Sequence, residues 1–448
     1  MQRLPPFADG PSTADLVHSE GGAPGDRRTI LFAWEMGGGL GHLMQMRPLA
    51  EDLARAGHRV FVALRQLERA ALVFGRSNVS LLQAPAWAGG APRFPRAATF
   101  SQMLMNVGFG SDAELYGRAC AWRNLLRLVR PELVVFDHSP TALLASRGLP
   151  CPARRALIGS GFCCPPDEIC PDTGTWAVLR AGAAARAGAD ALPVADEAVL
   201  ARCNRMLGRW GQPPLGRLGQ LYGEVDENFL TTFAELDHFP ARAGATYWGP
   251  VPSHGGDEPG WPDGPGPRVF AYLKRRDGKL LEELFGALRD AGCSTVAYVE
   301  GMDERGRHES PALRLAPRPL KAAAAARACD LAVLHGGHGT VAGVLLAGKP
   351  MLLLPLALEQ HLLADAVARV GAGEVRDPSR LEDVRDALSR VVSSPTYAAA
   401  ALAFAERHHD FDPGRQRRLM LERCEALLPV HPRSCSCQAI LSRVGEGS

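Results

Sequence analysis

Short apolar runs alternate with amphipathic segments along the first part of the chain. Residues 29–34 are β-branched, aromatic and aliphatic, a composition typical of a buried parallel strand. After the glycine-rich stretch 37–41, apolar residues recur at helical spacing between 43 and 53, and Gly57 supplies a stop signal. The run 59–64 predicts a second strand. A strand, a helix and a strand in this order predict a parallel sheet with helices on both faces.

Further strands of the same sheet are expected at 133–136 and 156–158. Between 161 and 223 the pattern becomes irregular and includes an alanine-rich stretch. We therefore expect loops and helices added over one face of this first domain. The chain has 448 residues, which is too long for one ordinary core and favours two domains.

The stretch 249–267 holds six prolines and six glycines, a composition that favours a linker over packed elements. Beyond it the alternation returns, with a helix expected at 280–288 and strands at 269–273, 294–299, 331–334 and 351–354. The chain is therefore expected to be an α/β protein of two doubly wound, Rossmann-like domains, 28–248 and 268–410, facing one another across a cleft.

Composition and charge narrow the class of protein. The hydrophobic fraction is 46%, the charged fraction 22% and the net charge +2, which predict a globular protein without a nucleic-acid-binding surface. The eleven cysteines lack zinc-like spacing, so we expect reduced thiols in the cytoplasm. Residues 1–27 lack the apolar stretch of a secretory signal and predict a disordered tail, and residues 429–448 are expected to form a second tail. The apolar run 351–358 is too short to span a bilayer, which leaves only a peripheral membrane contact open.

The sequence His-Gly-Gly-His-Gly-Thr occupies residues 335–340, between the expected strand 331–334 and a helix expected from Thr340 to Ala347. Its glycines let the backbone approach a ligand, and the N–H groups at the start of a helix suit a pyrophosphate. The side chains of His335 and Thr340 could add hydrogen bonds to phosphate oxygens. A turn of this kind is, however, often only a tight connection.

The longer stretch 335–373 resembles the donor-binding signature of the GT-B-fold glycosyltransferases that include plant, macrolide and glucuronosyl transferases. The matching elements are His335, Gly337, Gly339-Thr340, Gly348-Lys-Pro350 and Glu359-Gln360. The resemblance implies donor-binding roles at His335, Gly336, Gly337, His338, Gly339, Thr340, Glu359 and Gln360. Among these, His335, Gly339 and Thr340 would contact the diphosphate, and Glu359 and Gln360 would bind sugar hydroxyls. The alternative for Glu359-Gln360 is a capped, solvated helix start.

Two departures from the plant members leave the nucleotide base open. Gly343 stands where those members carry a glutamate that holds the ribose, and residues 316–320 contain no aromatic residue to stack on a base. The donor is therefore expected to be either a UDP-sugar or a dTDP-sugar. Glucose is mildly favoured as the sugar because Gln360 closes the acid–glutamine pair.

The first domain resembles the same family over residues 37–63, and the resemblance implies that His42 is the general base. Histidine suits this role because its ordinary pKa lies near neutrality. Asp137, at the end of the expected strand 133–137, would orient it. The alternatives are a packing histidine at 42 and a helix cap at 137. Gly39 and Gly41 are candidates for a donor-phosphate loop.

Two further histidines near these positions are assigned other roles. We expect His138 to face away from His42, and His58 only to close a helix. The resemblance covers about residues 28–425, and in this fold the helical region 411–428 would return to the first domain.

The resemblance implies an inverting displacement that needs no metal or cofactor, with a small-molecule acceptor. The acceptor pocket would involve residues 84–116 and 159–171, whose apolar side chains fit either a hydrophobic acceptor or ordinary core. Other readings are a nucleotide-sugar epimerase or hydrolase of the same fold, a binding protein that kept the donor site, and a transferase with a lipid-linked acceptor. A nicotinamide-dependent oxidoreductase is disfavoured because His42 stands where its third glycine belongs.

Overall fold

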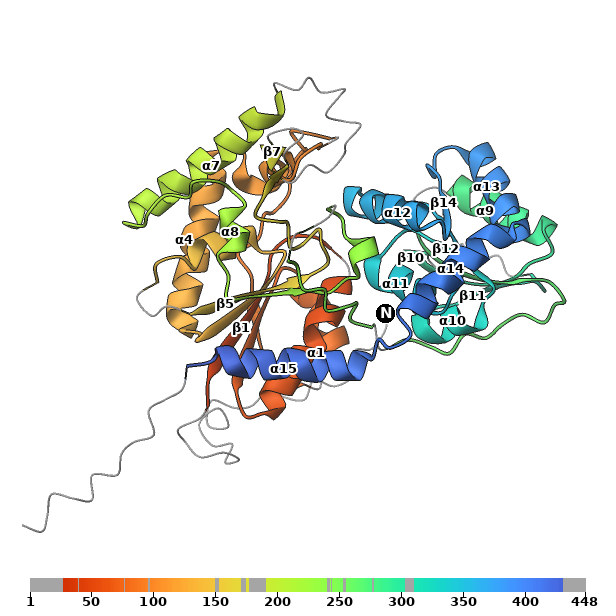
Figure 1. Ribbon diagram of the computed structural model, residues 1–448, viewed down its shortest axis with the longest axis horizontal. Coiled ribbons are helices and arrows are strands. Elements are labelled where there is room, and N and C mark those ends of the chain that lie inside the picture. Colours follow the sequence, from red (N-terminus) through yellow and green to blue (C-terminus); the bar gives the residue numbers. More distant parts are fainter. Residues whose placement is uncertain are drawn as a thin grey trace, which may run out of the picture.

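The structure is a computed structural model that describes residues 27–429, except 39, 76, 96, 150–152, 171–174, 177–190, 240, 241, 243, 253, 254, 276, 277 and 303–309. The tails expected at 1–27 and 429–448 lie outside the described residues apart from Arg27 and Pro429. Two α/β domains lie side by side (Figure 1). No helix among the described residues combines the length and the apolarity needed to cross a bilayer.

The first domain is built on a parallel sheet of six strands in the order β3-β2-β1-β4-β5-β8. The strands are β1 (Thr29–Trp34), β2 (Arg59–Leu64), β3 (Ser80–Gln83), β4 (Leu133–Asp137), β5 (Arg154–Gly159) and β8 (Glu227–Leu230). The helices are α1 (Gly41–Arg55), α2 (Ala70–Phe74), α3 (Phe100–Leu104), α4 (Asp112–Val129), α5 (Pro140–Ala145), α7 (Ala191–Arg209) and α8 (Gln220–Gly223). A small antiparallel pair, β6 (Ile169–Cys170) and β7 (Thr175–Trp176), lies in the irregular region.

The second domain repeats this plan with a six-stranded parallel sheet in the order β11-β10-β9-β12-β13-β14. Its strands are β9 (Arg268–Lys274), β10 (Ser294–Glu300), β11 (Leu313–Leu315), β12 (Leu331–Leu334), β13 (Met351–Leu353) and β14 (Gly373–Val375). Its helices are α9 (Gly278–Asp290), α10 (Ala322–Ala328), α11 (His338–Leu346), α12 (Leu358–Val370), α13 (Leu381–Ser393) and α14 (Pro395–Arg407). The predicted fold class of two doubly wound domains is confirmed.

The central strands are apolar throughout because both faces of each sheet are covered. All six residues of β1 are buried. Ile30 and Phe32 pack on the face covered by α1, whereas Leu31 and Ala33 pack on the opposite face with residues of α4. A strand buried on both faces loses the usual alternation of polar and apolar residues, which is why it appears in the sequence as a continuous apolar run.

The last helix, α15 (Pro413–Leu427), lies along α1 of the first domain (Figure 1). Met420 and Cys424 join the core formed beneath α1. His58 Nε2 lies 2.8 Å from Glu425 Oε1 on this helix, and His58 Nδ1 accepts a hydrogen bond from the Arg28 backbone. The expectation that His58 only closes a helix is therefore wrong, because its ring joins the first domain to the returning helix.

Residues 233–236 leave the first domain earlier than the sequence pattern suggests. Phe233 and Leu236 pack in the core of the second domain, and the Phe233 ring stacks on His408 with ring centroids 4.0 Å apart. The chain then returns to the first sheet, where Tyr247 forms a bridge with Leu230. The two domains are thus joined by an inserted loop as well as by the proline-rich segment that follows.

Helix α11 begins at His338, two residues before the predicted start at Thr340. Gly336 has a φ of +94°, and Gly337 is extended and forms the N-cap. These two glycines complete the turn, since glycine adopts positive-φ and extended backbone conformations with little steric cost. The helix can therefore start at once after them.

Candidate active site

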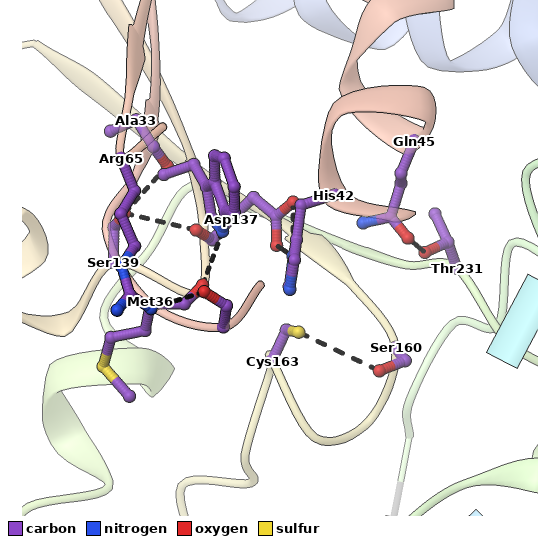
Figure 2. Close-up of polar contacts among 12 residues, drawn as sticks. Ala33, Met36, His42, Gln45, Arg65, Asp137, Ser139, Ser160, Cys163 and Thr231 are labelled. Carbon is purple, nitrogen blue, oxygen red and sulfur yellow. Dashed lines mark hydrogen bonds and ion pairs between the residues drawn. The ribbon is translucent and has the colours of Figure 1, made fainter. Parts of the chain in front are cut away.

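His42 and Asp137 meet at the edge of the first sheet where its strand order reverses, a place where parallel sheets commonly bind ligands. Asp137 is the last residue of β4, and His42 is the second residue of α1. His42 Nδ1 lies 3.0 and 3.1 Å from the two carboxylate oxygens of Asp137 (Figure 2). The N-cap of α5 is Ser139, so the carboxylate of Asp137 does not cap a helix. It is available to orient His42.

Burial and charge set the protonation of His42. The Asp137 carboxylate has no exposed surface, and the His42 side chain is only 13% exposed. Burial by itself lowers the pKa of His42, but Asp137, through its charge and hydrogen bond, and Glu359, through its charge, raise it above its ordinary value. Because Nδ1 faces Asp137, Nε2 is the ring nitrogen left to accept a proton. This arrangement is that of a general base oriented by a carboxylate.

The glycine loop before α1 supports the ring of His42. Gly37 has a φ of +82°, and a Cβ added there would lie 2.4 Å from His42 Nε2. Glycine at this position therefore leaves space at the reactive nitrogen. Of the two residues expected to hold phosphate, Gly39 lies outside the described residues, and Gly41 is the first residue of α1 with open space around its Cα.

The ring of His138 lies beside His42, which contradicts the expectation that it faces away. The ring centroids are 6.1 Å apart and the planes differ by 9°. The cause is the left-handed backbone at His138, whose φ of +47° is uncommon for a residue with a side chain. Burial, helped by the charges of His42 and Arg65, lowers the pKa of His138 to about 3. His138 is therefore neutral and a weak base beside the stronger one.

Glu359 brings the second domain to the same place. It is the second residue of α12, and its charge and that of His42 act on one another. Burial raises the pKa of Glu359, and the charge of Asp137 adds to this, while His42 and Lys274 oppose it. Groups from both domains therefore share one electrostatic environment.

His335 follows β12 and is held by the neighbouring strand. Its Nδ1 lies 3.0 Å from the carbonyl oxygen of Tyr272 on β9 and donates a hydrogen bond to it. Burial lowers the pKa of His335. A Cβ added at Gly337 would lie 3.6 Å from His335 Nε2, so this second nitrogen faces the glycine turn.

The turn at 336–337 directs the start of α11 toward α12. A Cβ at Gly336 would lie 3.3 Å from the Cβ of Gln360, a close approach that favours glycine. The backbone N–H groups of Thr340 and Val341 already point to the Gly337 carbonyl oxygen. The N–H groups of His338 and Gly339 precede the first helical hydrogen bonds, and such groups are suited to an anion.

Two of the expected donor contacts have protein partners in this structure. His338 Nε2 lies 2.8 Å from Thr232 Oγ1 of the first domain, so its side chain joins the domains. Gln360 Oε1 accepts hydrogen bonds from the backbone of Leu356 and Ala357, at 2.8 and 3.2 Å. Gln360 thus caps the start of its own helix, and its amide nitrogen is the group left for a ligand.

Two cations near the site did not stand out in the sequence. Lys274 ends β9, and its charge acts on both His335 and Glu359. Arg65 follows β2, donates a hydrogen bond to the Gly37 carbonyl oxygen and acts by charge on His42. Both lie at the ends of strands next to those that carry the motifs, and only the order of strands in each sheet could have suggested them.

Among the described residues, one group has the spacing of metal ligands: His42, Asp137 and Cys163, whose ligand atoms lie within 4.8 Å of one another. Burial raises the pKa of the Cys163 thiol well above its usual value. The loop drawn in Figure 2 places Cys163 next to the His42–Asp137 pair.

Part of the predicted wall of the acceptor pocket lies in the hydrophobic core of the first domain. Phe109 is buried, and Phe162 packs in an aromatic cluster around Phe100 with Trp176 and Tyr222. Below this cluster, Glu35 accepts hydrogen bonds from Trp122 Nε1 and from the Thr141 backbone. Burial raises the pKa of Glu35 to about 7 despite the opposing charge of Arg118. Met103 and Met105 are half-buried, as are Trp87 and Phe94.

Residues 314–412 match the family model of the Glycosyltransferase family 28 C-terminal domain, which includes the whole stretch from His335 to Gln360. The chain has the GT-B fold, and the resemblance drawn from its sequence is confirmed. The calicheamicin glycosyltransferase CalG4 shares that fold at a TM-score of 0.64 and 20% identity, over 90% of this chain and 98% of that one. The Streptomyces sp. SF2575 glycosyltransferase SsfS6, in complex with thymidine diphosphate, has a TM-score of 0.61 and 20% identity over 88% and 100%.

Curated relatives match over shorter stretches. A PGL/p-HBAD biosynthesis glycosyltransferase of Mycobacterium tuberculosis (strain ATCC 25177 / H37Ra) is 32% identical over 143 residues, 31% of this chain and 33% of the relative. A PGL/p-HBAD biosynthesis rhamnosyltransferase of Mycobacterium bovis (strain BCG / Pasteur 1173P2) is 31% identical over 192 residues, 42% of this chain and 41% of the relative. The matches therefore span between a third and two fifths of these relatives.

Proposed function

We propose that this protein is a glycosyltransferase that moves a sugar from a nucleoside diphosphate sugar to a hydroxyl of a small acceptor. The observation that carries the proposal is the His42–Asp137 pair of the first domain, which shares its electrostatic environment with Glu359 of the second domain. Glu359 lies within the stretch that matches a glycosyltransferase domain family. A base and a donor site from different domains are what transfer between two substrates requires.

In the proposed reaction His42 Nε2 removes the proton of the acceptor hydroxyl, while Nδ1 keeps its hydrogen bond to Asp137. The acceptor oxygen forms a bond to the anomeric carbon as the bond from that carbon to the diphosphate breaks. The bonding pair leaves on the diphosphate, and the proton stays on the imidazolium, next to the Asp137 charge. Attack opposite the leaving group inverts the configuration.

The leaving diphosphate would be stabilised by groups of this chain. The first N–H groups of α11 carry the positive end of the helix dipole, and Lys274, whose Nζ lies 3.5 Å from Glu300 Oε2, adds positive charge near His335. With these groups at the leaving diphosphate, we propose a reaction that needs no divalent cation. The donor proposed first is a dTDP-sugar, with a UDP-sugar as the second choice, because two of the similar structures, SsfS6 and VinC, were solved with thymidine diphosphate or dTDP.

The acceptor is proposed to be a hydroxylated, largely apolar molecule of the natural-product or glycolipid type. The half-buried Met103 and Met105 offer an apolar, adaptable surface next to the aromatic cluster. The similar proteins named above include a calicheamicin glycosyltransferase and a PGL/p-HBAD biosynthesis glycosyltransferase, which favours the same broad class of acceptor here.

The proposal is tested by incubating the protein with dTDP-glucose or UDP-glucose, in EDTA, with a panel of phenols, macrolide aglycones and phenolic lipids. Mass spectrometry should find an acceptor heavier by one hexose, and NMR should show a β-linked product from the α-linked donor. His42→Ala should abolish the product, while His409→Ala, at an exposed position, should not. Release of free glucose without any acceptor product would instead indicate a hydrolase.

A further inference from the structure

His238 is a buried histidine with one ring nitrogen that no protein group serves. The residue follows the turn at 234–236 and is 5% exposed. Within the described part of the chain its ring has no side-chain hydrogen-bond partner, and the Glu359 backbone is the group placed to accept from its N–H. Whichever tautomer is present, the nitrogen acceptor is left without a partner. Leaving buried polar groups in this state is costly, so they are commonly completed by a ligand or by water.

The backbone that carries His238 is held firmly. Asp237 forms an ion pair with Arg242 (Oδ2 to Nε, 2.7 Å), and both side chains are almost fully buried. Tyr247 donates a hydrogen bond to the same carboxylate at 2.9 Å, and the Phe239 backbone donates another at 3.1 Å. The residue just before His238 is therefore fixed by three groups, which helps to hold the ring in place, as expected of a group that recognises a ligand.

The position of His238 joins three parts of the proposed site. Its ring lies 6.1 Å from the ring of His338, the first residue of α11, and the backbone of Glu359 at the start of α12 lies beside it. On the other side is the ring of Phe162, at 5.8 Å, which in turn contacts His138 next to His42. His238 thus lies between the proposed diphosphate site, the acid of α12 and the catalytic histidine.

The chemistry of the ring points to one class of ligand group. Burial lowers the pKa of His238 well below its ordinary value, so the imidazole is neutral and offers one donor and one acceptor. Phosphate oxygens only accept hydrogen bonds and would leave the acceptor nitrogen unused. A sugar hydroxyl can donate a hydrogen bond to this nitrogen, so it matches the unused group.

We propose that His238 binds a hydroxyl of the donor sugar and helps to select which sugar is transferred. This inference rests on the proposed function. It assigns the role to a residue of the loop inserted between the domains, outside the glycine-rich motif and outside the Glu359-Gln360 pair. The diphosphate and the base of the nucleotide would make their contacts elsewhere, on α11 and the second sheet.

The test compares dTDP with dTDP-glucose, and UDP with UDP-glucose, by calorimetry on the full chain. The variants are His238→Phe, which keeps a ring and removes both polar atoms, and His238→Asn and His238→Gln, which keep a donor and an acceptor. We expect His238→Phe to bind the nucleoside diphosphate within twofold of the parent protein but to lose roughly tenfold in affinity for the sugar nucleotide. At least one of the two amide variants should recover part of that loss.

A series of deoxy sugar nucleotides would identify the hydroxyl, because its removal should weaken binding to the parent protein but not to His238→Phe. Equal loss of affinity for the nucleoside diphosphate and the sugar nucleotide would overturn the inference by showing a structural role. An unchanged ratio of the two affinities would also overturn it and would indicate that water satisfies the ring. If a folded parent protein bound neither dTDP nor UDP, the proposed function itself would have failed.

Discussion

The hydrogen bond from His42 to Asp137 predicts a specific effect of removing one charge. Asp137→Asn keeps the shape of the side chain but removes the charge that stabilises the imidazolium and fixes its tautomer. We expect the turnover number to fall by about 10² to 10⁴. Affinity for dTDP should stay within twofold, because Asp137 pairs with His42 in the first domain, whereas the proposed nucleotide site is at the start of α11 in the second. An unchanged turnover number with weaker dTDP binding would contradict the role assigned to this carboxylate.

The raised pKa of His42 predicts the acid limb of the pH profile. The base acts only when neutral, so kcat/KM should rise with pH as His42 loses its proton, at a pKa above its ordinary value of about 6.5. The charge and hydrogen bond of Asp137 raise that pKa, so their loss in Asp137→Asn should move the acid limb to lower pH. Rate profiles of both proteins between pH 5 and 9 measure this shift. A limb that stays in place would show that another group titrates.

The hydrogen bond and the lowered pKa of His335 predict that the protein takes up a proton when it binds a diphosphate. In the free protein its Nδ1 donates to Tyr272 and burial keeps its pKa low, so Nε2 carries no proton to offer a phosphate oxygen. An adjacent phosphate raises the pKa of an imidazole and favours protonation at Nε2. Calorimetry of dTDP in buffers of different ionisation enthalpy, near neutral pH, should therefore show uptake that His335→Gln removes. Equal uptake in both proteins would mean that His335 does not contact the diphosphate.

Residues in motifs could be predicted from the sequence, whereas residues placed by the fold could not. His42, Asp137 and His335 follow strands that are recognisable as apolar runs, so their positions at one sheet edge could be inferred. The ring of His138 is turned by a left-handed backbone that a sequence pattern does not reveal. Lys274 acquires its place from the order of strands in the second sheet, and His238 from a loop that crosses between domains.

At the scale of elements, helix α15 should stabilise the first domain through its buried face. Met420 is 3% exposed in the core under α1, whereas its neighbour Leu419 is 43% exposed. Met420→Ala should lower the free energy of unfolding by about 2–5 kcal/mol, while Leu419→Ala should change it by no more than about 0.5 kcal/mol. Denaturant unfolding of the two variants measures the difference. Equal stability of both would show that α15 does not form part of this core.

The strands were easier to predict than the helix ends. Central strands such as β4 and β12 are buried on both faces, so they appear as continuous apolar runs whose ends are set by polar or glycine residues. The predicted start of α11 lies two residues too late. Several glycines in a row can each adopt the backbone conformation that ends the turn, so the sequence does not show after which glycine the helix begins. The helices α7 and α8 of the region 161–223 carry no comparable apolar run, since the residues they pack against lie far away in the sequence.

At the scale of the whole molecule, the chain passes between the domains several times. Phe233 enters the second core, Tyr247 returns to the first sheet, and α15 crosses back after the second domain ends. The contact of His338 with Thr232 joins the start of α11 to the first domain. Multiple connections of this kind hold the proposed donor groups close to His42, which the transfer between two bound substrates requires.

The central claim is that the second domain binds a nucleoside diphosphate at the start of α11. It is tested most directly by titrating the protein with dTDP, UDP, GDP and NAD by calorimetry in the presence of EDTA, alongside His335→Ala, Lys274→Ala and the exposed control His409→Ala. We expect dTDP or UDP to bind without metal, both site variants to weaken that binding about tenfold or more, and the control to leave it unchanged. Binding of NAD alone, or no nucleotide binding by the folded protein, would contradict the account.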